Sequence, residues 1–403
     1  MEANKTPEIR FKGFSAAWEQ RKLGEFGSVA MCKRIYKEQT SEQGDVPFFK
    51  IGTFGTNPDA FISNELFEYF KRTYPYPTPG TLLISAAGSI GRVVEYQGEK
   101  AYFQDSNIVW LEHDHRLNDM FLKPLYSQIE WGLEGSTIKR LYNKDLLSAE
   151  VTIPGSGEQK EIGRFFAKLD DLITLHQRKC DKLVKLKSAM LDRMFPKPGD
   201  SEPEIRFATF KEPWGRYKLG DVAAIARGER FTASDYVESG GIPCIHYGEI
   251  YTSYGTIATK TISQVSSSLK DSLRYAKQGD VIVAATSENV EDVCKAVVWM
   301  GNSPVAYHDD SFALTFSGDP IFLVSFFETS EFFAHKSSTA HGVKVMRVSS
   351  DSLADVDLPL PSAAEQRLIG GYFAKLDNLI TLHQRKLEGL RRLKTALLNK
   401  MFV

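Results

Sequence analysis

The sequence has few cysteines and lacks a long apolar run. Its four cysteines, at positions 32, 180, 244 and 294, are scattered without a CxxC pair, which argues against a disulfide framework or a structural zinc site. There is no run of eighteen apolar residues and no charged segment followed by an apolar leader. We therefore expect a soluble, cytoplasmic protein with no membrane partner.

An excess of charge of either sign is also missing. The 403 residues include 50 Lys and Arg against 51 Asp and Glu, a formal net charge of −1. A freestanding nucleic-acid-binding protein usually has a basic balance. Any contact with nucleic acid must therefore come from local basic patches, or from partners that supply the positive field.

Motifs for catalysis are absent as well. The chain has no GxGxxG after a strand, no GxxxxGK[ST], no HExxH and no GxSxG. It also lacks the [DNS]PP[YF] box of adenine methyltransferases. His113 and His115 flank an aspartate in a polar stretch, but no third ligand is in sight. We therefore predict neither catalytic residues nor a metal site.

A long internal repeat is the most informative feature that is present. Residues 158–195 recur as residues 365–402, with about 24 of the 38 positions identical and LDxLITLHQRK in both copies. Apolar residues alternate at spacings of four and three, which predicts a helix with a coiled-coil seam. At about 1.5 Å per residue, each helix is roughly 54 Å long. The predicted seam includes Leu169, Ile173, His176 and Leu183 in the first copy and Leu376, Ile380, His383 and Leu390 in the second.

The repeat predicts how the two helices pair. If a pseudo-twofold axis relates the halves, the helices run antiparallel, and His176 and His383 face each other near the middle of the seam. A polar seam residue fixes the register at some cost in stability. The alternative is two amphipathic helices that pack separately, each on its own domain.

Each half also opens with the same phrase, PEIRFxxFxxxWxxxKLG, at residues 7–24 and 203–220. The stretches between phrase and helix differ, and both alternate short β-rich runs, such as 81–88, 107–112, 280–286 and 312–316, with turn residues. We predict an α+β fold that is a pseudo-twofold tandem repeat. Mixed α/β domains occupy residues 1–157 and 204–364, long antiparallel coiled-coil helices occupy 158–196 and 365–403, and a linker occupies 197–203.

Polar residues at corresponding places in the two halves are the best candidates for contacts with DNA. Arg, Lys, Asn, Gln and His side chains contact base edges in the major groove, and phosphate contacts set the register. The candidates in the first half are Lys33, Arg34, Lys50, Ser85, Ser89, Arg92, Lys139, Arg140 and Lys144; those in the second half are Arg227, Arg230, His246, Ser287, Asn289, Lys344 and Arg347.

The duplicated organisation resembles the specificity (S) subunit of type I restriction–modification enzymes. The resemblance rests on the opening phrases and on the entries into the helices, Ile153-Pro154 with Glu158-Gln159 and Leu360-Pro361 with Glu365-Gln366. It covers essentially the whole chain in both copies.

The resemblance implies that each variable domain is a target recognition domain that reads one half of a bipartite double-stranded DNA site. The helices would set the gap, about 16 base pairs for 54 Å, and dock two methyltransferase (M) subunits. Restriction/translocase (R) subunits would join the complex. S-adenosylmethionine, ATP and Mg would be bound by the partner subunits, with no cofactor on this chain.

Two other functions stay open at the level of sequence. A non-catalytic scaffold, with two globular heads that bind proteins on a coiled-coil spacer, is compatible with the composition. A self-contained methylating nuclease is opposed by the missing cofactor and methylation motifs.

Overall fold

The computed structural model describes residues 6–114, 116–131, 140–342 and 344–403. Two compact units are present, one of residues 1–175 with 387–403 and one of residues 176–386. Helices α4 (Ser156–Met194) and α10 (Ala363–Met401) each continue from one unit into the other, so each unit contains a segment of both. Both begin two residues before the predicted positions. Among the described residues, no helix is long and apolar enough to cross a membrane.

The first unit is built mainly from two small sheets. One has the strand order β2-β8-β5-β6 and the other β4-β3-β7, while β1 pairs only with β9. Its elements are β1 (Glu19–Lys22), β2 (Gly27–Ala30), β3 (Val46–Phe49), β4 (Phe61–Ile62), α1 (Asn64–Thr73), β5 (Leu82–Ser85), β6 (Val93–Glu95), β7 (Tyr102–Phe103), β8 (Ile108–His113), α2 (Asp119–Tyr126), α3 (Asn143–Ser148) and β9 (Glu150–Ile153).

Strands β5 and β8 are buried on both faces. They run antiparallel, and alternate side chains of each strand point to opposite faces of the sheet. Ile84 and Leu111 belong to one hydrophobic cluster, while Leu83 and Trp110 belong to another. A strand with core on both sides needs a continuous apolar run, which is why residues 81–88 and 107–112 were recognisable in the sequence.

The second unit repeats this plan with more strands. Its main sheets have the orders β11-β20-β16-β18-β13 and β14-β12-β19-β15, and two-stranded pairs join β17 to β21 and β10 to β22. Its elements are β10 (Gly215–Lys218), α5 (Leu219–Val222), β11 (Ala223–Arg227), β12 (Ile242–Ile245), α6 (Tyr247–Thr252), β13 (Ile257–Ala258), β14 (Ser263–Val265), β15 (Tyr275–Ala276), β16 (Val281–Ala284), β17 (Thr286–Ser287), β18 (Ala296–Trp299), β19 (Val305–Tyr307), β20 (Ser311–Phe316), α7 (Pro320–Phe326), α8 (Ser330–Thr339), β21 (Met346–Arg347), α9 (Ser350–Ala354) and β22 (Asp357–Leu360).

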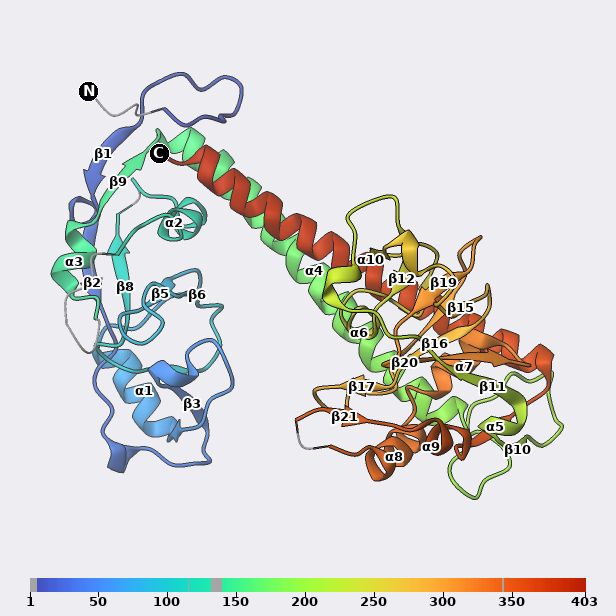
Figure 1. The fold of residues 1–403 in the computed structure, drawn as a ribbon. Coiled ribbons are helices and arrows are strands. Elements are labelled where there is room, and N and C mark those ends of the chain that lie inside the picture. Colours follow the sequence, from blue (N-terminus) through green and yellow to red (C-terminus); the bar gives the residue numbers. More distant parts are fainter. Residues whose placement is uncertain (1–5, 115, 132–139, 343) are drawn as a thin grey trace. The chain divides into compact units, whose positions relative to one another are not determined.

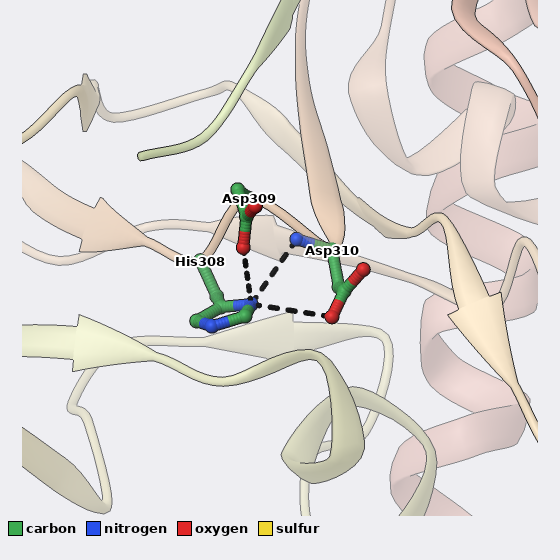
Figure 2. A group of neighbouring side chains, drawn as sticks. All are labelled: His308, Asp309 and Asp310. Carbon is green, nitrogen blue, oxygen red and sulfur yellow. Dashed lines mark hydrogen bonds and ion pairs between the residues drawn. The ribbon is translucent and has the colours of Figure 1, made fainter. Parts of the chain in front are cut away.

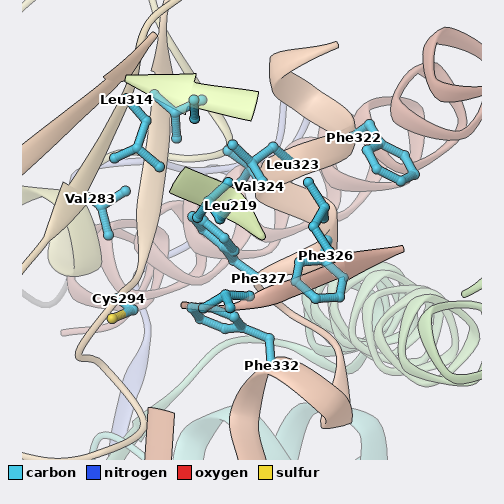
Figure 3. Close-up of a cluster of buried hydrophobic side chains, with 14 of the residues drawn as sticks. Leu219, Val283, Cys294, Leu314, Phe322, Leu323, Val324, Phe326, Phe327 and Phe332 are labelled. Carbon is cyan, nitrogen blue, oxygen red and sulfur yellow. The ribbon is translucent and has the colours of Figure 1, made fainter. Parts of the chain in front are cut away.

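The central strand β16 is also enclosed on both sides. Val281 and Val283 face a large cluster that includes the phenylalanines of α7 and α8, shown in Figure 3. Ile282 and Ala284 face a separate cluster on the opposite side of the sheet. The two unlike variable sequences therefore fold around the same kind of doubly covered sheet.

In the first unit, α4 and α10 pack antiparallel. The Phe166 and Phe402 rings lie 6.0 Å apart between centroids, and four residues further along α4 the Asp170 carboxylate lies 2.5 Å from the Lys394 ammonium group. The residue number falls along α10 as it rises along α4, so the helices run in opposite directions. Leu169 is buried here, with Ile173 and Leu390 packed against the same cluster.

The second unit contains the other half of the helix pair, again antiparallel. Phe195 and Phe373 have ring centroids 6.2 Å apart, and the Lys187 Nζ lies 2.6 Å from Asp377. The seam residues Leu376 and Leu183 join the same hydrophobic cluster, and Ile380 is half-buried. Figure 1 shows α4 in green beside α10 in red.

The predicted histidine pair is confirmed. The Nδ1 atoms of His176 and His383 are 2.8 Å apart, within hydrogen-bonding distance. One imidazole must donate while the other accepts, so the pair fits only when at least one Nδ1 is unprotonated.

The opening phrases attach each unit to both helices. In the first unit, the Arg10 guanidinium makes a two-pronged ion pair with Glu158 at the start of α4, with distances of 2.6 and 2.7 Å. The Ile9 N–H donates to the Lys400 carbonyl near the end of α10 (2.9 Å). The second phrase repeats both contacts, Arg206 with Glu365 of α10 and the Ile205 N–H with the Arg193 carbonyl of α4.

The glutamine that follows each buried glutamate joins the helix to the domain before it. Gln159 donates from Nε2 to the Pro154 carbonyl and accepts at Oε1 from the Asn118 N–H. Gln366 makes the equivalent bonds to the Pro361 carbonyl and from the Asp319 N–H. The Glu-Gln pair thus gives each domain a fixed attachment to its helix.

Replacing Glu158 with Ala should reduce the free energy of unfolding by about 3–5 kcal/mol, because it leaves the Arg10 guanidinium without its partner in a site where the carboxylate side chain is only 2% exposed. Urea unfolding followed by circular dichroism measures the change. The control is Glu19→Ala, whose partner Arg21 is exposed, and which should cost at most about 1 kcal/mol. Equal losses in the two variants would contradict the role given to the buried pair.

Acid should weaken the histidine pair. Desolvation, the facing His383 and the Lys386 and Lys179 ammonium groups lower the pKa of His176. The unfolded chain then binds protons more readily than the folded one, so the stabilisation is complete above the ordinary histidine pKa of about 6.5 and is lost as the pH falls below it.

Unfolding midpoints of the wild type and of a His176→Asn, His383→Asn double variant, compared between about pH 8 and about pH 5, test this expectation. The wild type should lose more stability on acidification than the double variant. Parallel pH profiles would show that the pair does not titrate in this way.

Candidate nucleic-acid interface

In the first unit, the predicted residues converge on the loop of residues 104–107, between β7 and β8. The Arg34 Nε donates to the Asp105 carboxylate (2.8 Å), and the Arg140 Nη2 donates to the Ser106 carbonyl (2.9 Å). Ser106 has a positive φ of 60°, which turns the backbone sharply at this point. Two arginines that are far apart in the sequence are therefore held on consecutive residues of one loop.

The glycine-containing turn after β5 lies beside the same loop. Ser85 is buried, and its hydroxyl accepts from the Arg92 N–H (2.9 Å) and donates to the Ser89 carbonyl, so it closes the turn from inside. Gly88 and Gly91 both have positive φ, and the Ala87 backbone pairs with that of Arg140. Ser85 thus shapes the surface, whereas Ser89 and Arg92 are exposed on it.

The other candidates of the first unit are placed less uniformly. The Lys50 ammonium group pairs with Asp59 (2.9 Å). The next residue, Ile51, donates its N–H to the Gln104 side chain (2.9 Å). The Lys33 ammonium lies over the Tyr74 ring instead, 5.1 Å from its centroid. Lys144 is exposed on α3, and Lys139 lies outside the described residues.

In the second unit, the corresponding loop is residues 308–310, between β19 and β20 (Figure 2). The His308 Nε2 lies 3.0 Å from the Phe231 carbonyl and must donate to it, while Nδ1 accepts from the Asp310 N–H (3.1 Å). These two bonds fix the His308 ring, and with it the loop. The Arg227 Nε donates to the Asp309 carbonyl (2.7 Å).

The backbone around the two loops matches bond for bond. The N–H of Ala86 donates to the Asn107 carbonyl, as that of Ala285 donates to the Asp310 carbonyl, both at 2.8 Å. On the other side, Leu141 donates to the Ala86 carbonyl (2.9 Å), as Val348 donates to the Ala285 carbonyl (3.0 Å). Arg140 and Arg347 thus occupy equivalent positions beside the two loops.

His308, Asp309 and Asp310 could each offer one ligand atom to a metal ion, all within 4.8 Å of one another. Their bonds indicate a different role. The His308 Nδ1 lone pair is directed at a backbone N–H, and the Asp310 carboxylate accepts from the Thr286 hydroxyl (3.0 Å). A cation there would also lie near the Arg227 guanidinium, whose Nη2 is 3.9 Å from the Asp309 carboxylate. These residues fit the task of shaping the loop, not that of ligating a metal.

The remaining candidates of the second unit lie around this loop. Strand β17 pairs with β21, which places Thr286 opposite Arg347. Ser287 is buried, and its hydroxyl closes a turn by accepting from the Asn289 N–H (3.2 Å). Arg230, Lys344 and Arg347 are exposed, and their side chains make no hydrogen bond or ion pair with other residues that the structure describes.

His246 lies against the side of the 308–310 loop. Its ring centroid is 4.2 Å from that of Tyr247 and 5.3 Å from that of His308. Burial, and secondarily the neighbouring His308, lower the pKa of His246, so it is neutral near pH 7. Because its Nδ1 accepts from the Gly248 N–H (3.1 Å), Nε2 carries the proton and is the available donor.

Several supporting residues were missed by reasoning from the sequence. Asp105 and Asp309 organise the two loops, and they lie two and three residues before the predicted β-rich runs 107–112 and 312–316, a position that could have singled them out. Lys336 had no such signal. It is buried in α8, and its ammonium donates to the Glu291 and Val293 carbonyls (2.8 and 2.9 Å), which fixes the turn that carries Asn289.

The candidate side chains around the 104–107 and 308–310 loops are hydrogen-bond donors suited to binding a ligand. Each unit presents guanidinium, ammonium and amide donors around one rigid loop, next to carboxylates that hold them. Such donors contact phosphate oxygens and base edges.

Comparisons with known proteins agree with this organisation. Residues 16–185 and 211–392 match the family described as the type I restriction modification DNA specificity domain. A Haemophilus influenzae protein named as a type I restriction enzyme specificity subunit is 51% identical over 152 residues, 37% of this chain and 40% of that protein, so the match spans less than half of its length. The MjaVIII specificity subunit of Methanocaldococcus jannaschii is 22% identical over 79% of this chain and 75% of its own.

The fold has a known counterpart too. The crystal structure of a type I restriction–modification S subunit from M. genitalium superposes with a TM-score of 0.66 at 16% identity, covering 99% of both chains. The family match extends over both variable domains and most of both long helices. The chain therefore belongs to the family of type I restriction modification DNA specificity domains.

Proposed function

We propose that this chain reads DNA sequence for a type I restriction–modification enzyme, with each unit recognising one half of a bipartite site. The observation that carries the proposal is the duplicated loop. In each unit, one loop before a central strand binds the Nε of an arginine, Arg34 or Arg227. Each loop also lies beside a second arginine, Arg140 or Arg347, and the backbone bonds around this second arginine match between the halves. Two such surfaces, built on the same kind of scaffold from unlike sequences, fit two different half-site sequences.

In this proposal the two long helices set the length of the gap between the two half-sites and dock the methyltransferase subunits. The docking is supported by leucines that the helix pair leaves uncovered. Leu172 and Leu175 in the first unit are each 45% exposed, and their repeat equivalents Leu379 and Leu382 in the second unit are 44% and 45% exposed. Exposed apolar patches mark protein–protein contact surfaces, and the same two leucines are exposed in both copies of the helix.

Catalysis belongs to the partners in this proposal. Two M subunits bind S-adenosylmethionine and methylate adenine, and R subunits bind ATP and Mg. The complex acts on DNA in the cytoplasm. A chain with no net excess of positive charge fits this division, because the partners can supply the positive field that double-stranded DNA attracts.

The deciding experiment uses the chain in complex with its M subunits. A pool of random duplexes is selected for binding, and methylated adenines are mapped genome-wide in cells with and without this chain. We expect one bipartite sequence in both assays, with methylation lost when the chain is absent. A protein-binding scaffold would enrich no bipartite sequence and would leave the methylation pattern unchanged.

Removing two unpaired basic groups beside the second loop should weaken DNA binding without changing the DNA sequence that the complex selects. For a Lys344→Gln, Arg347→Gln variant of the complex, we expect the slope of log affinity against log salt to fall by about 0.9 for each phosphate that the variant no longer neutralises. Affinity titrations at several salt concentrations measure the slope. A Lys211→Gln, Lys260→Gln variant, which removes the same charge from exposed positions on other segments, should keep the wild-type slope.

A further inference from the structure

Two arginines of the interface share a pattern of bonding. Arg34 in the first unit and Arg227 in the second each donate from Nε to the loop beside them, and each side chain is 58% exposed. Neither arginine uses its terminal nitrogens, Nη1 and Nη2, in a hydrogen bond to another residue that the structure describes. Each therefore presents an anchored guanidinium with two terminal nitrogens that make no hydrogen bond to those residues.

Other arginines of the chain are committed differently. Arg10 and Arg206 use Nη2 as well as Nε to hold the buried glutamates. Arg116 binds Asp114 and the Glu25 carbonyl, and Arg216 uses both terminal nitrogens, on Glu331 and the Lys197 carbonyl. These four arginines thus use terminal nitrogens in hydrogen bonds within the protein, whereas Arg34 and Arg227 do not.

The anchor removes much of the freedom of the side chain. The Asp105 carboxylate is only 15% exposed and also accepts from the Ser106 hydroxyl (3.1 Å), so its own position is fixed. The Asp309 carbonyl belongs to a loop held by His308. A guanidinium tethered at Nε on such a support loses less rotamer entropy when its terminal nitrogens bind a ligand.

Two parallel N–H donors match a ligand edge that carries two adjacent acceptors. In the DNA major groove this edge is that of guanine, with O6 and N7 side by side. Adenine places an amino donor beside its N7, and the other bases offer no pair of adjacent acceptors. A phosphate group also offers two oxygens, so the surroundings of the arginines must distinguish the two ligands.

The surroundings favour the base. The Arg34 charge is already balanced by Asp105, and the Arg227 guanidinium has the Asp309 carboxylate 3.9 Å from its Nη2. A carboxylate repels a phosphate anion brought to the same guanidinium, but it does not repel the neutral edge of a base. Lys344 and Arg347, which have no such carboxylate, are better suited to phosphate.

We propose that Arg34 and Arg227 each read one guanine, the first in the half-site of the first unit and the second in the half-site of the second. Asp105 and the Asp309 carbonyl act as positioning groups that aim the guanidinium. This inference rests on the proposed function and assigns a base to one residue in each unit.

The experiment uses the complex with M subunits and the bipartite sequence selected by the wild type. Arg34→Ala and Arg34→Lys should relax one guanine position of one half-site, with a loss of discrimination of roughly tenfold to a hundredfold. Arg227→Ala and Arg227→Lys should do the same in the other half-site only. Lysine fails because a single ammonium group does not reproduce the two-pronged contact.

A chemical substitution in the DNA identifies the contact independently. Replacing that guanine with 7-deazaguanine removes the N7 acceptor and should weaken binding by the wild type roughly tenfold. The same substitution should leave binding by Arg34→Ala unchanged, because that variant has no guanidinium to bind N7. Asp105→Asn should relax the same position as Arg34→Ala, since it frees the guanidinium from its ion pair.

Arg116→Ala and Arg216→Ala are the matched controls and should leave both half-sites as they are, since their terminal nitrogens are bound within the protein. If the unmutated unit still selects its half-site sequence, the variant is folded. A uniform loss of affinity over all sequences, or relaxation at no guanine, would overturn the inference while the proposed function stands. A wild-type complex that selects no bipartite sequence would overturn both.

Discussion

Both units depend on a glutamate buried in the first turn of a long helix. Glu158 and Glu365 are stable there because each accepts two hydrogen bonds from an arginine of the preceding phrase, and because the helix N-terminus favours negative charge. The same phrases bond to carbonyls near the opposite end of the other helix. Each phrase thus binds the start of one helix and the end of the other. A shift of either helix end therefore changes contacts of the attached domain.

The long elements could be predicted from the sequence because their signals are local. Heptad spacing and the absence of interior proline determine α4 and α10, and the repeat itself predicts that His176 meets His383. Buried strands such as β5 and β16 were recognisable as apolar runs between turn residues. The short strands β4, β7 and β13, of two residues each, carry no such signal and form only because neighbouring strands supply their partners.

The candidate interface was harder to predict because its contacts are distant in the sequence. Arg34 meets Asp105 across 71 positions, and Arg227 meets Asp309 across 82. A serine in a glycine-rich turn has the same sequence signature whether its hydroxyl faces solvent or closes the turn, so the burial of Ser85 and Ser287 could not be foreseen. The match between halves identified the region, and the fold decides which of its side chains are free.

The acidic residues of the candidate interface fit the proposal that a chain without excess positive charge reads DNA selectively. Each carboxylate beside an arginine weakens the general attraction to phosphate, which contributes affinity without sequence information. It leaves the two-pronged hydrogen bonds to a base edge intact, because these depend on geometry. The proposed function therefore predicts weak binding of random DNA by this chain alone, and selectivity once partner subunits hold the duplex against its loops.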